Sequence, residues 1–185
     1  MKPRDYAVKN WLDFLRLTDN ELIKHCRTDV FKATGKGGQK KNKTSNAIRL
    51  TLSHLVVTES KSRSKAENIK KALKKLRIAI ATDSRHNLVG SDNTISPPNE
   101  ILPYLHTSEI HINSRNPVFP IFLGYFFVSY IKYKGNWNSL GNELGFTTSQ
   151  LRKFVGKQGT LKQTFDRMQS EWRTTFASDF EPVES

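Results

Sequence analysis

The 185-residue chain has little cysteine, no long apolar segment and no metal-ligand pattern, and each shortage excludes a class of protein. Cys26 is the single cysteine, so no intramolecular disulfide can form, and a reducing compartment is expected. The longest apolar run, residues 118–131, contains Pro120 and Gly124 and is too short to span a bilayer, so no membrane partner is expected. The five histidines lack zinc-ligand spacing, so we expect neither a metal nor another cofactor.

The start of the chain also lacks the apolar core of a secretory signal. Asp5 and Asp13 argue against a mitochondrial transit peptide. We therefore expect a cytoplasmic protein of bacterial type, with a mitochondrial location left open.

Positive charge is abundant, and it is unevenly distributed. The chain carries 30 Lys or Arg against 17 Asp or Glu, a net charge of +13. Residues 1–90 hold 21 of the former and eight of the latter, whereas residues 91–185 hold nine of each. A basic first half suits a phosphate-rich partner such as RNA. The alternative is a lysine-rich face that is only solvated.

Within this basic half lies a glycine-rich stretch without acidic residues or histidine. Gly35, Gly37 and Gly38 suit backbone that takes positive φ or approaches another molecule closely. Gln39 follows them, and its amide both donates and accepts hydrogen bonds. Residues 33–50 contain no Asp, Glu or His, so no protein general base is available in the stretch itself.

The amino-acid sequence of this stretch resembles a motif of a known protein family. Residues 33–39, followed by Asn42-Lys43-Thr44 and Ala47-Ile48-Arg49, resemble the catalytic loop of class I peptide-chain release factors. The expected order of strand, loop, two strands and basic helix over residues 18–81 is similar to the catalytic domain of that family. The resemblance thus covers under half of the chain.

The resemblance implies a reaction and its partners. The loop would enter the peptidyl transferase centre, where the protein hydrolyses the ester of ribosome-bound peptidyl-tRNA. Large-subunit rRNA and peptidyl-tRNA are the implied partners. Gly37, Gly38 and Gln39 are the implied catalytic residues, with the Gln39 N–H stabilising the oxyanion and its side chain orienting water.

Two features distinguish members of the family. The Asn-Lys-Thr-Ser-Asn spelling at residues 42–46 resembles small codon-independent rescue members, and only 34 residues precede Gly35, too few for a codon-reading domain. Codon-independent rescue of stalled ribosomes is therefore the expected role. Lys40 and Lys41 depart from the family's loop, the second replacing an apolar residue. The alternative is a catalytically inactive ribosome- or rRNA-binding protein.

Periodic patterns predict an α+β fold for the first half, with a small mixed sheet from which the loop projects. The expected elements are helices at 6–17 and 19–26, strands at 30–33, 48–52 and 55–59, and a helix from about 64 to 81. The second and third helices open with capping-box spellings, Thr18 with Glu21 and Ser64 with Glu67.

The helix at 64–81 combines an apolar stripe with a basic face. The stripe, expected to pack on the sheet, is Ala66, Ile69, Leu73, Leu76 and Ile80. The residues expected to bind RNA, around the loop and along this helix, are Lys36, Lys40, Lys41, Lys43, Arg49, Lys65, Lys70, Lys71, Lys74 and Lys75.

The composition changes near residues 90–99, which are rich in Gly, Ser and Pro. We expect a hydrolysis domain at 1–88, a linker at 89–100 and a small all-α domain at 101–185. Helices are expected at 104–112, at 120–133 and from Thr160 onward.

Residues 139–155 have helix-turn-helix spelling, with Thr147 and Gln150 as a capping box. Such turns are usually packing devices, so DNA binding is the less favoured reading. Contact with rRNA or a protein partner is the other role considered. The cations available for it are Lys132, Lys134, Arg152, Lys153 and Lys157.

Overall fold

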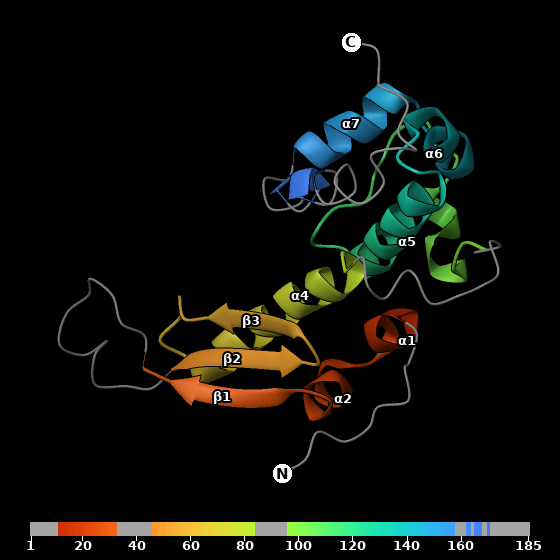
Figure 1. The fold of residues 1–185 in the computed structure, drawn as a ribbon. Helices are drawn as coiled ribbons and strands as arrows, with labels where there is room; N and C mark the ends of the chain where they lie inside the picture. Colours follow the sequence, from red (N-terminus) through yellow and green to blue (C-terminus); the bar gives the residue numbers. More distant parts are fainter. Residues whose placement is uncertain are drawn as a thin grey trace. The chain divides into compact units, whose positions relative to one another are not determined.

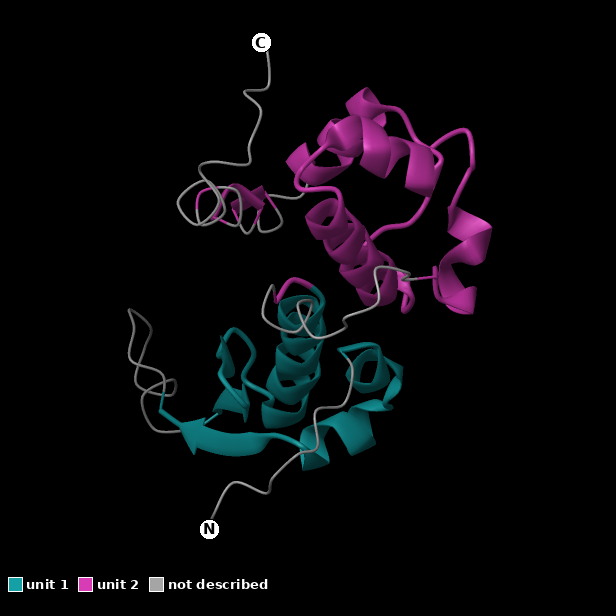
Figure 2. Cartoon of the chain, turned by 45° about the vertical axis from the view of Figure 1, so that its right-hand side comes forward, with its two compact units in different colours: residues 1–81 teal, residues 82–185 magenta. Residues whose placement is uncertain are grey.

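The computed structural model describes residues 11–32, 46–83 and 96–157, together with residues 162, 163, 165–167 and 170. The chain divides into two compact units, residues 1–81 and residues 82–185, coloured separately in Figure 2. The first combines helices with a sheet and the second is helical, so the α+β class expected from the sequence is confirmed.

The first unit is built around a three-stranded sheet with the order β1-β2-β3 (Figure 1). Both pairings are antiparallel, so the sheet is not mixed in strand direction. Its elements are α1 (Trp11–Arg16), α2 (Asp19–Lys24), β1 (Arg27–Phe31), β2 (Ala47–Leu52), β3 (Leu55–Glu59) and α4 (Lys65–Ala81). The first strand starts earlier than predicted and ends at Phe31, whereas β3 has the predicted bounds.

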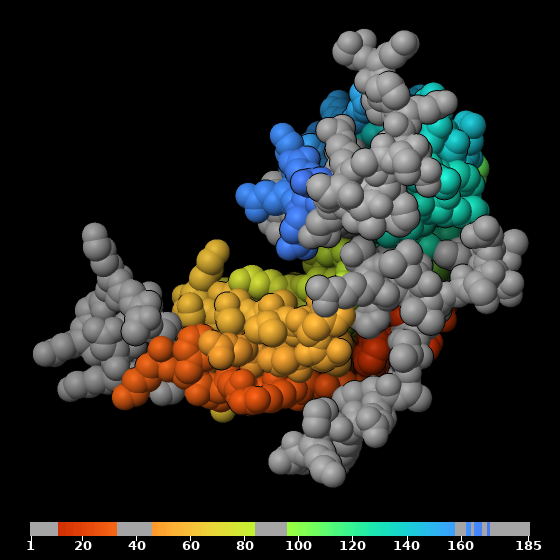
Figure 3. Space-filling view, in the orientation of Figure 1, coloured from red at the N-terminus to blue at the C-terminus, as the bar shows by residue number. Residues whose placement is uncertain are grey.

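Helix α4 covers one face of the sheet and forms an aliphatic core with it. Alternate residues of β2 point into this core, and Ile48 and Leu50 have no exposed surface. From α4, Leu73, Leu76 and Ile80 are buried, as the predicted stripe requires. The other face of the sheet is turned toward the viewer in Figure 3.

The two N-terminal helices are tied to α4 by Arg77. Its guanidinium donates to the carbonyls of Leu15 and Leu17 at 2.9 and 2.6 Å and pairs with Asp19 at 2.9 Å. The predicted capping box before α2 is confirmed, with its N-cap at Thr18. The predicted helix at 6–17 is seen from residue 11 onward, and residues 6–10 lie outside the described part.

The second unit is helical in its described residues. Its elements are the 3₁₀ helix η2 (Asn99–Tyr104), α5 (Phe119–Lys132), α6 (Trp137–Leu144) and α7 (Thr148–Gly156). The predicted helix at 104–112 is wrong, because η2 ends at Tyr104 and His106 takes a positive φ of 53° that no right-handed helix accommodates. The helix predicted from Thr160 falls mostly outside the described residues and stays a prediction.

The core of the second unit is aromatic. Helix α5 is buried on nearly all sides, and Phe126 has no exposed surface. Its ring centroid lies 5.6 to 6.5 Å from those of Phe127, Trp137, Phe154 and Phe165, within the range of favourable ring pairs. No helix among the described residues is long and apolar enough to cross a membrane.

The turn between α6 and α7 has the predicted helix-turn-helix form. Gly145 ends α6 in the left-handed conformation, with φ 77°. A side chain there would collide with His106, because a Cβ would lie 2.4 Å from the His106 Cα. The capping box of Thr147 and Gln150 then opens α7.

Candidate functional site

The glycine-rich stretch connects β1 to β2. Residues 33–45, which include Gly37, Gly38 and Gln39 and the four loop lysines at 36, 40, 41 and 43, lie outside the described residues. Phe31, the last residue of β1, pairs with Ala47, the first of β2. The connection therefore leaves and re-enters the sheet at the same end.

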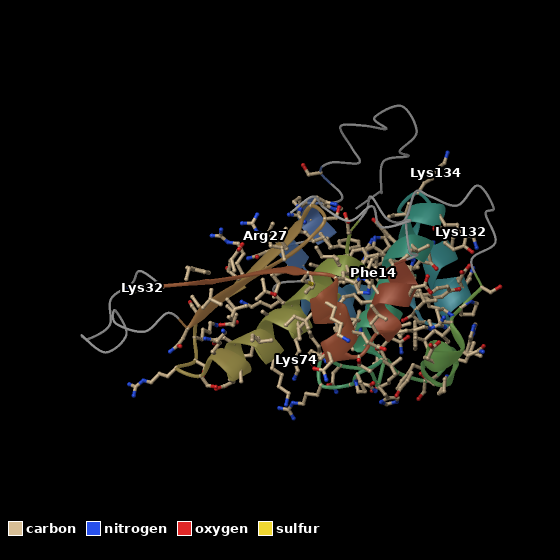
Figure 4. All side chains as sticks on the ribbon, turned by 90° about the horizontal axis from the view of Figure 1, so that it is seen from below. Phe14, Arg27, Lys32, Lys74, Lys132 and Lys134 are labelled. Carbon is tan, nitrogen blue, oxygen red and sulfur yellow. The ribbon has the colours of Figure 1, made fainter. Side chains whose placement is uncertain are left out.

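A cation–π contact joins the two strands beside this connection. The Arg49 guanidinium carbon lies 5.2 Å from the Phe31 ring centroid, which is an attractive geometry. Arg49 is exposed and lies opposite Asp29 and Thr58 on the sheet face away from α4. Lys32 follows at the end of β1 (Figure 4).

Asn68 of α4 secures the other end of the connection. Its side chain is fully buried, and its Nδ2 donates to the carbonyls of Asn46 and Ser62 at 2.7 and 2.9 Å. Its Oδ1 accepts the Ser62 N–H at 2.9 Å. The Asn46 side chain in turn donates to the Arg63 carbonyl at 2.7 Å.

Asn68 was not predicted from the sequence, because the expected stripe of α4 contained apolar residues alone. The stripe prediction was wrong at Ala66, which is exposed, and Ile69 is only half-buried. Asn68 lies four and eight residues before the buried Ala72 and Leu76. This spacing places an asparagine on the core face of the helix and was the available signal.

The start of α4 differs from the predicted capping box. Ser64 Oγ accepts the Glu67 N–H at 3.3 Å, which is the expected N-cap bond. The reciprocal bond is replaced, because Ser64 N–H donates to Ser62 Oγ at 3.1 Å. The Glu67 carboxylate instead accepts from the Ser62 hydroxyl and pairs with Lys71 at 2.6 Å.

Four of the predicted RNA-binding lysines on α4 form two adjacent rows, and the two lysines of each row are one helical turn apart. In one row, Lys71 pairs with Glu67, and Lys75 pairs with Glu59 at 2.9 Å while donating to the Thr58 carbonyl at 3.0 Å. In the other row, Lys70 and Lys74 are exposed and have no acidic partner among the described residues. Figure 4 shows Lys74 on the outer side of α4. Lys65 is exposed at the start of the helix.

Glu59 is a buried carboxylate beneath this helix. The hydrogen bond from Lys75 lowers its pKa to about 2, and the N–H groups of Ser60 and Lys61 add to this against the opposing effect of burial. Lys75 therefore stabilises the contact between α4 and β3, and it is a poor candidate for RNA contact.

In the second unit, Arg152 and Lys132 are candidate cations that make internal contacts. Arg152 lies over the Trp137 ring at 5.7 Å, and Lys132 pairs with Glu143 at 3.1 Å. Although burial raises the pKa of Glu143, hydrogen bonds from Tyr125, Tyr133 and Lys132 outweigh it and leave this pKa below its usual value. This cluster joins α5 to α6.

Three further features bear on ligand binding: a hollow beside α7, the single cysteine and the distribution of metal-ligand residues. Lys153 and Phe154 of α7, with Lys157 just after it, line a hollow of about 580 Å³. Cys26 is half-buried, its thiol donates to the Leu22 carbonyl at 3.3 Å, and burial raises its pKa to about 11. Among the described residues, no group of three His, Cys, Asp or Glu side chains could hold a metal ion.

Comparison with known proteins identifies a domain in the first part of the chain. Residues 20–94 match the family model described as RF-1 domain. The chain is 46% identical over 59 residues to peptide chain release factor 1 of Lacticaseibacillus casei, covering 31% of this chain and 16% of that protein. It is 44% identical over 63 residues to the protein of the same name from Acidiphilium cryptum, covering 32% and 17%.

A longer match is with peptide chain release factor 1 of Corynebacterium aurimucosum, 38% identical over 77 residues, covering 40% of this chain and 20% of that protein. The chain thus spans a fifth or less of the length of these relatives. No solved structure matches.

Proposed function

We propose that the chain is a class I release factor and hydrolyses the peptidyl-tRNA ester on the ribosome, because its residues 20–94 match the RF-1 domain and align with proteins named peptide chain release factor 1. One observation carries the proposal: the matched residues 20–94 contain the complete β1–β2 connection with Gly37, Gly38 and Gln39. The described strands bring both ends of that connection to one end of a small, well-packed sheet. A loop anchored in this way suits insertion into a confined site.

The proposed chemistry is attack of water on the ester carbonyl carbon. The Gln39 N–H donates to the oxyanion that develops, and the Gln39 side chain orients the water. Gly37 and Gly38 let the backbone approach the substrate. The bond to the tRNA ribose oxygen then breaks, and that oxygen takes up a proton. Since residues 33–50 hold no Asp, Glu or His, proton transfer falls to groups of tRNA and rRNA.

Within the family, we assign the chain to codon-independent rescue of stalled ribosomes in the cytoplasm. The support is the spelling of residues 42–46, which resembles rescue members. The second candidate, an inactive ribosome-binding protein, is favoured by Lys41, which stands where the family has an apolar residue.

We further propose which groups meet RNA. Lys70 and Lys74, with Lys65, contact large-subunit rRNA, because their ammonium groups are exposed and have no acidic partner in the described residues. Arg49, on the opposite face of the sheet, and the four loop lysines are proposed as further RNA contacts. Lys71 and Lys75 neutralise carboxylates instead.

The second unit is proposed to bind a partner. Residues 101–185 would act as a separate domain after a linker at 89–100. The cations Lys153 and Lys157 beside the hollow on α7 suit contact with rRNA or an acidic protein surface. DNA binding is disfavoured by the equal numbers of acidic and basic residues in this half.

A peptide-release assay tests the proposal. Ribosomes carrying labelled peptidyl-tRNA are incubated with the chain, with a stop codon, with a sense codon and with an empty decoding site. Release in all three states supports rescue, release at the stop codon alone supports codon-dependent termination, and binding without release supports the inactive reading.

Gln39→Ala assigns any release to the loop. The substitution removes the side chain that orients the water and keeps the backbone N–H, so we expect release to fall with ribosome binding unchanged. Because the oxyanion donor is the backbone N–H, Gly38→Ala, which adds a Cβ beside it, is the variant that displaces this donor. Losing one preorganised oxyanion donor typically lowers a rate by about 10²–10³-fold. Full activity in both would exclude this mechanism.

A further inference from the structure

We propose that Asn68 is a positioning residue for the hydrolysis, because its side chain holds the end of the catalytic loop against the start of α4. The inference rests on the proposed function, since it takes that loop as the source of the reacting groups. Asn46, whose carbonyl Asn68 binds, is the residue immediately before β2. Gln39 lies seven residues upstream.

The hydrogen bonds leave the Asn68 side chain one orientation. Its Nδ2 donates to two carbonyls, those of Asn46 at 2.7 Å and Ser62 at 2.9 Å, and its Oδ1 accepts the Ser62 N–H at 2.9 Å. Both amide hydrogens and one acceptor site are therefore used in a fully buried place. Aspartate lacks the two donors and leucine lacks every polar group, so an amide is required there.

A second hydrogen bond, made by the Asn46 side chain, also attaches the end of the loop to the segment before α4. The Asn46 side chain donates to the Arg63 carbonyl at 2.7 Å, so its main chain and its side chain both bind the segment just before α4. That helix carries Lys70 and Lys74, the proposed RNA contacts. The junction of Asn46, Ser62, Arg63 and Asn68 thus sets the position of the loop's end relative to the RNA-binding helix.

Positioning of this kind acts on the rate of the chemical step. A displacement of about 1 Å, even from a change outside the reacting groups, can lower a rate by about 10²-fold. Because the Asn68 side chain is fully buried, it cannot contact RNA in this conformation. Its loss should therefore lower the release rate at saturating protein and leave the half-saturating concentration nearly unchanged.

The test uses the full chain and three variants. Asn68→Leu removes all three side-chain hydrogen bonds and retains a buried side chain, and we expect release at saturation to fall by about 10²-fold. Asn46→Ala removes only the bond to Arg63, and we expect a fall of about 3- to 10-fold, as for one ordinary hydrogen bond. The matched control is Arg77→Leu, which removes three hydrogen bonds of the same helix elsewhere in the unit. It should melt at lower temperature and release at the native rate.

The release rates of these variants decide whether Asn68 is a positioning residue. Native release rates in both Asn68→Leu and Asn46→Ala would overturn it, and so would an equal loss in Arg77→Leu, because any destabilisation would then suffice. If Asn68→Leu does not fold, Asn46→Ala decides alone, since its side chain is only half-buried. A native chain that binds ribosomes but releases no peptide would overturn the proposed function itself, and this inference with it.

Discussion

The two units of this chain are stabilised by different kinds of core. The first buries aliphatic side chains between one helix and one face of a sheet, with Ile48, Leu50 and Leu76 fully enclosed. The second buries a cluster of aromatic rings around α5, with Phe122, Phe126 and Phe127 at its centre. Surface charge follows the same division, because the excess of Lys and Arg lies in residues 1–90. The proposed hydrolysis and the proposed partner binding are therefore expected to be separable.

The largest expected effect comes from a large-to-small substitution in the core of one unit, with the stability of both units measured. Phe126→Ala should destabilise the second unit by about 3–5 kcal/mol, because a fully buried ring is replaced by a methyl group. Its counterpart Leu76→Ala should destabilise the first unit by about 2–5 kcal/mol. Amide hydrogen exchange in α4 reports the stability of the first unit, and exchange in α5 reports that of the second. Faster exchange in both helices after either substitution would show that the units unfold together.

A second, smaller effect tests the buried carboxylate of the first unit. Glu59→Gln should destabilise that unit by about 1.5–3 kcal/mol at pH 7, because the carboxylate that accepts from the Lys75 ammonium and from two N–H groups is replaced by a neutral amide. Glu67→Gln, at an exposed carboxylate on α4, should have a much smaller effect. Urea unfolding of the first unit measures both.

The pH dependence of Glu59 has a definite sign. Its pKa is lowered from 4.5 to about 2, so its stabilisation is fully present above pH 4.5 and is lost as the pH falls toward 2. The gap in stability between the native chain and Glu59→Gln should therefore narrow at pH 3. A gap that widens would contradict the low folded-state pKa.

The smallest expected effect distinguishes the two lysine rows. Each phosphate contact contributes a salt slope of about 0.7–0.9, so Lys70→Gln with Lys74→Gln should reduce the loss of ribosome affinity between 50 and 200 mM salt by about tenfold. Lys71→Gln with Lys75→Gln should instead lower the melting temperature and change the slope less, because these lysines pair with carboxylates. Titrations at the two salt concentrations measure the slopes, and equal slopes for both pairs would contradict the assignment.

Local patterns predicted those parts of the fold that are determined locally. The bounds of β3 and α4, and the capping boxes at Thr18 and Thr147, were predicted correctly because strand alternation and caps depend on residues a few positions apart. The helix expected at 104–112 failed, since the chain there is held by contacts with distant residues. One example is the hydrogen bond from His106 N–H to the Leu144 carbonyl at 3.0 Å.

The candidate site was predicted less completely for the same reason. The resemblance identified Gly37, Gly38 and Gln39, which the described structure leaves as predictions. Asn68 was missed because a stripe traced by hydropathy passes over an asparagine, although its spacing to Ala72 and Leu76 places it on the core face of α4. Glu59 was missed because its partner Lys75 lies on a different element, and no local pattern shows that tertiary contact.

Arg77 also constrains when the first unit can form during synthesis. The carbonyls of Leu15 and Leu17 accept hydrogen bonds from the Arg77 guanidinium, which is synthesised 60 or more residues later. At about 5–20 residues per second, this delay lasts about 3–12 seconds, and the emerging N-terminal helices lack their partner throughout it. A nascent chain stopped before α4 should therefore leave α1 and α2 accessible to protease, and elongation through Ala81 should close them in a single step.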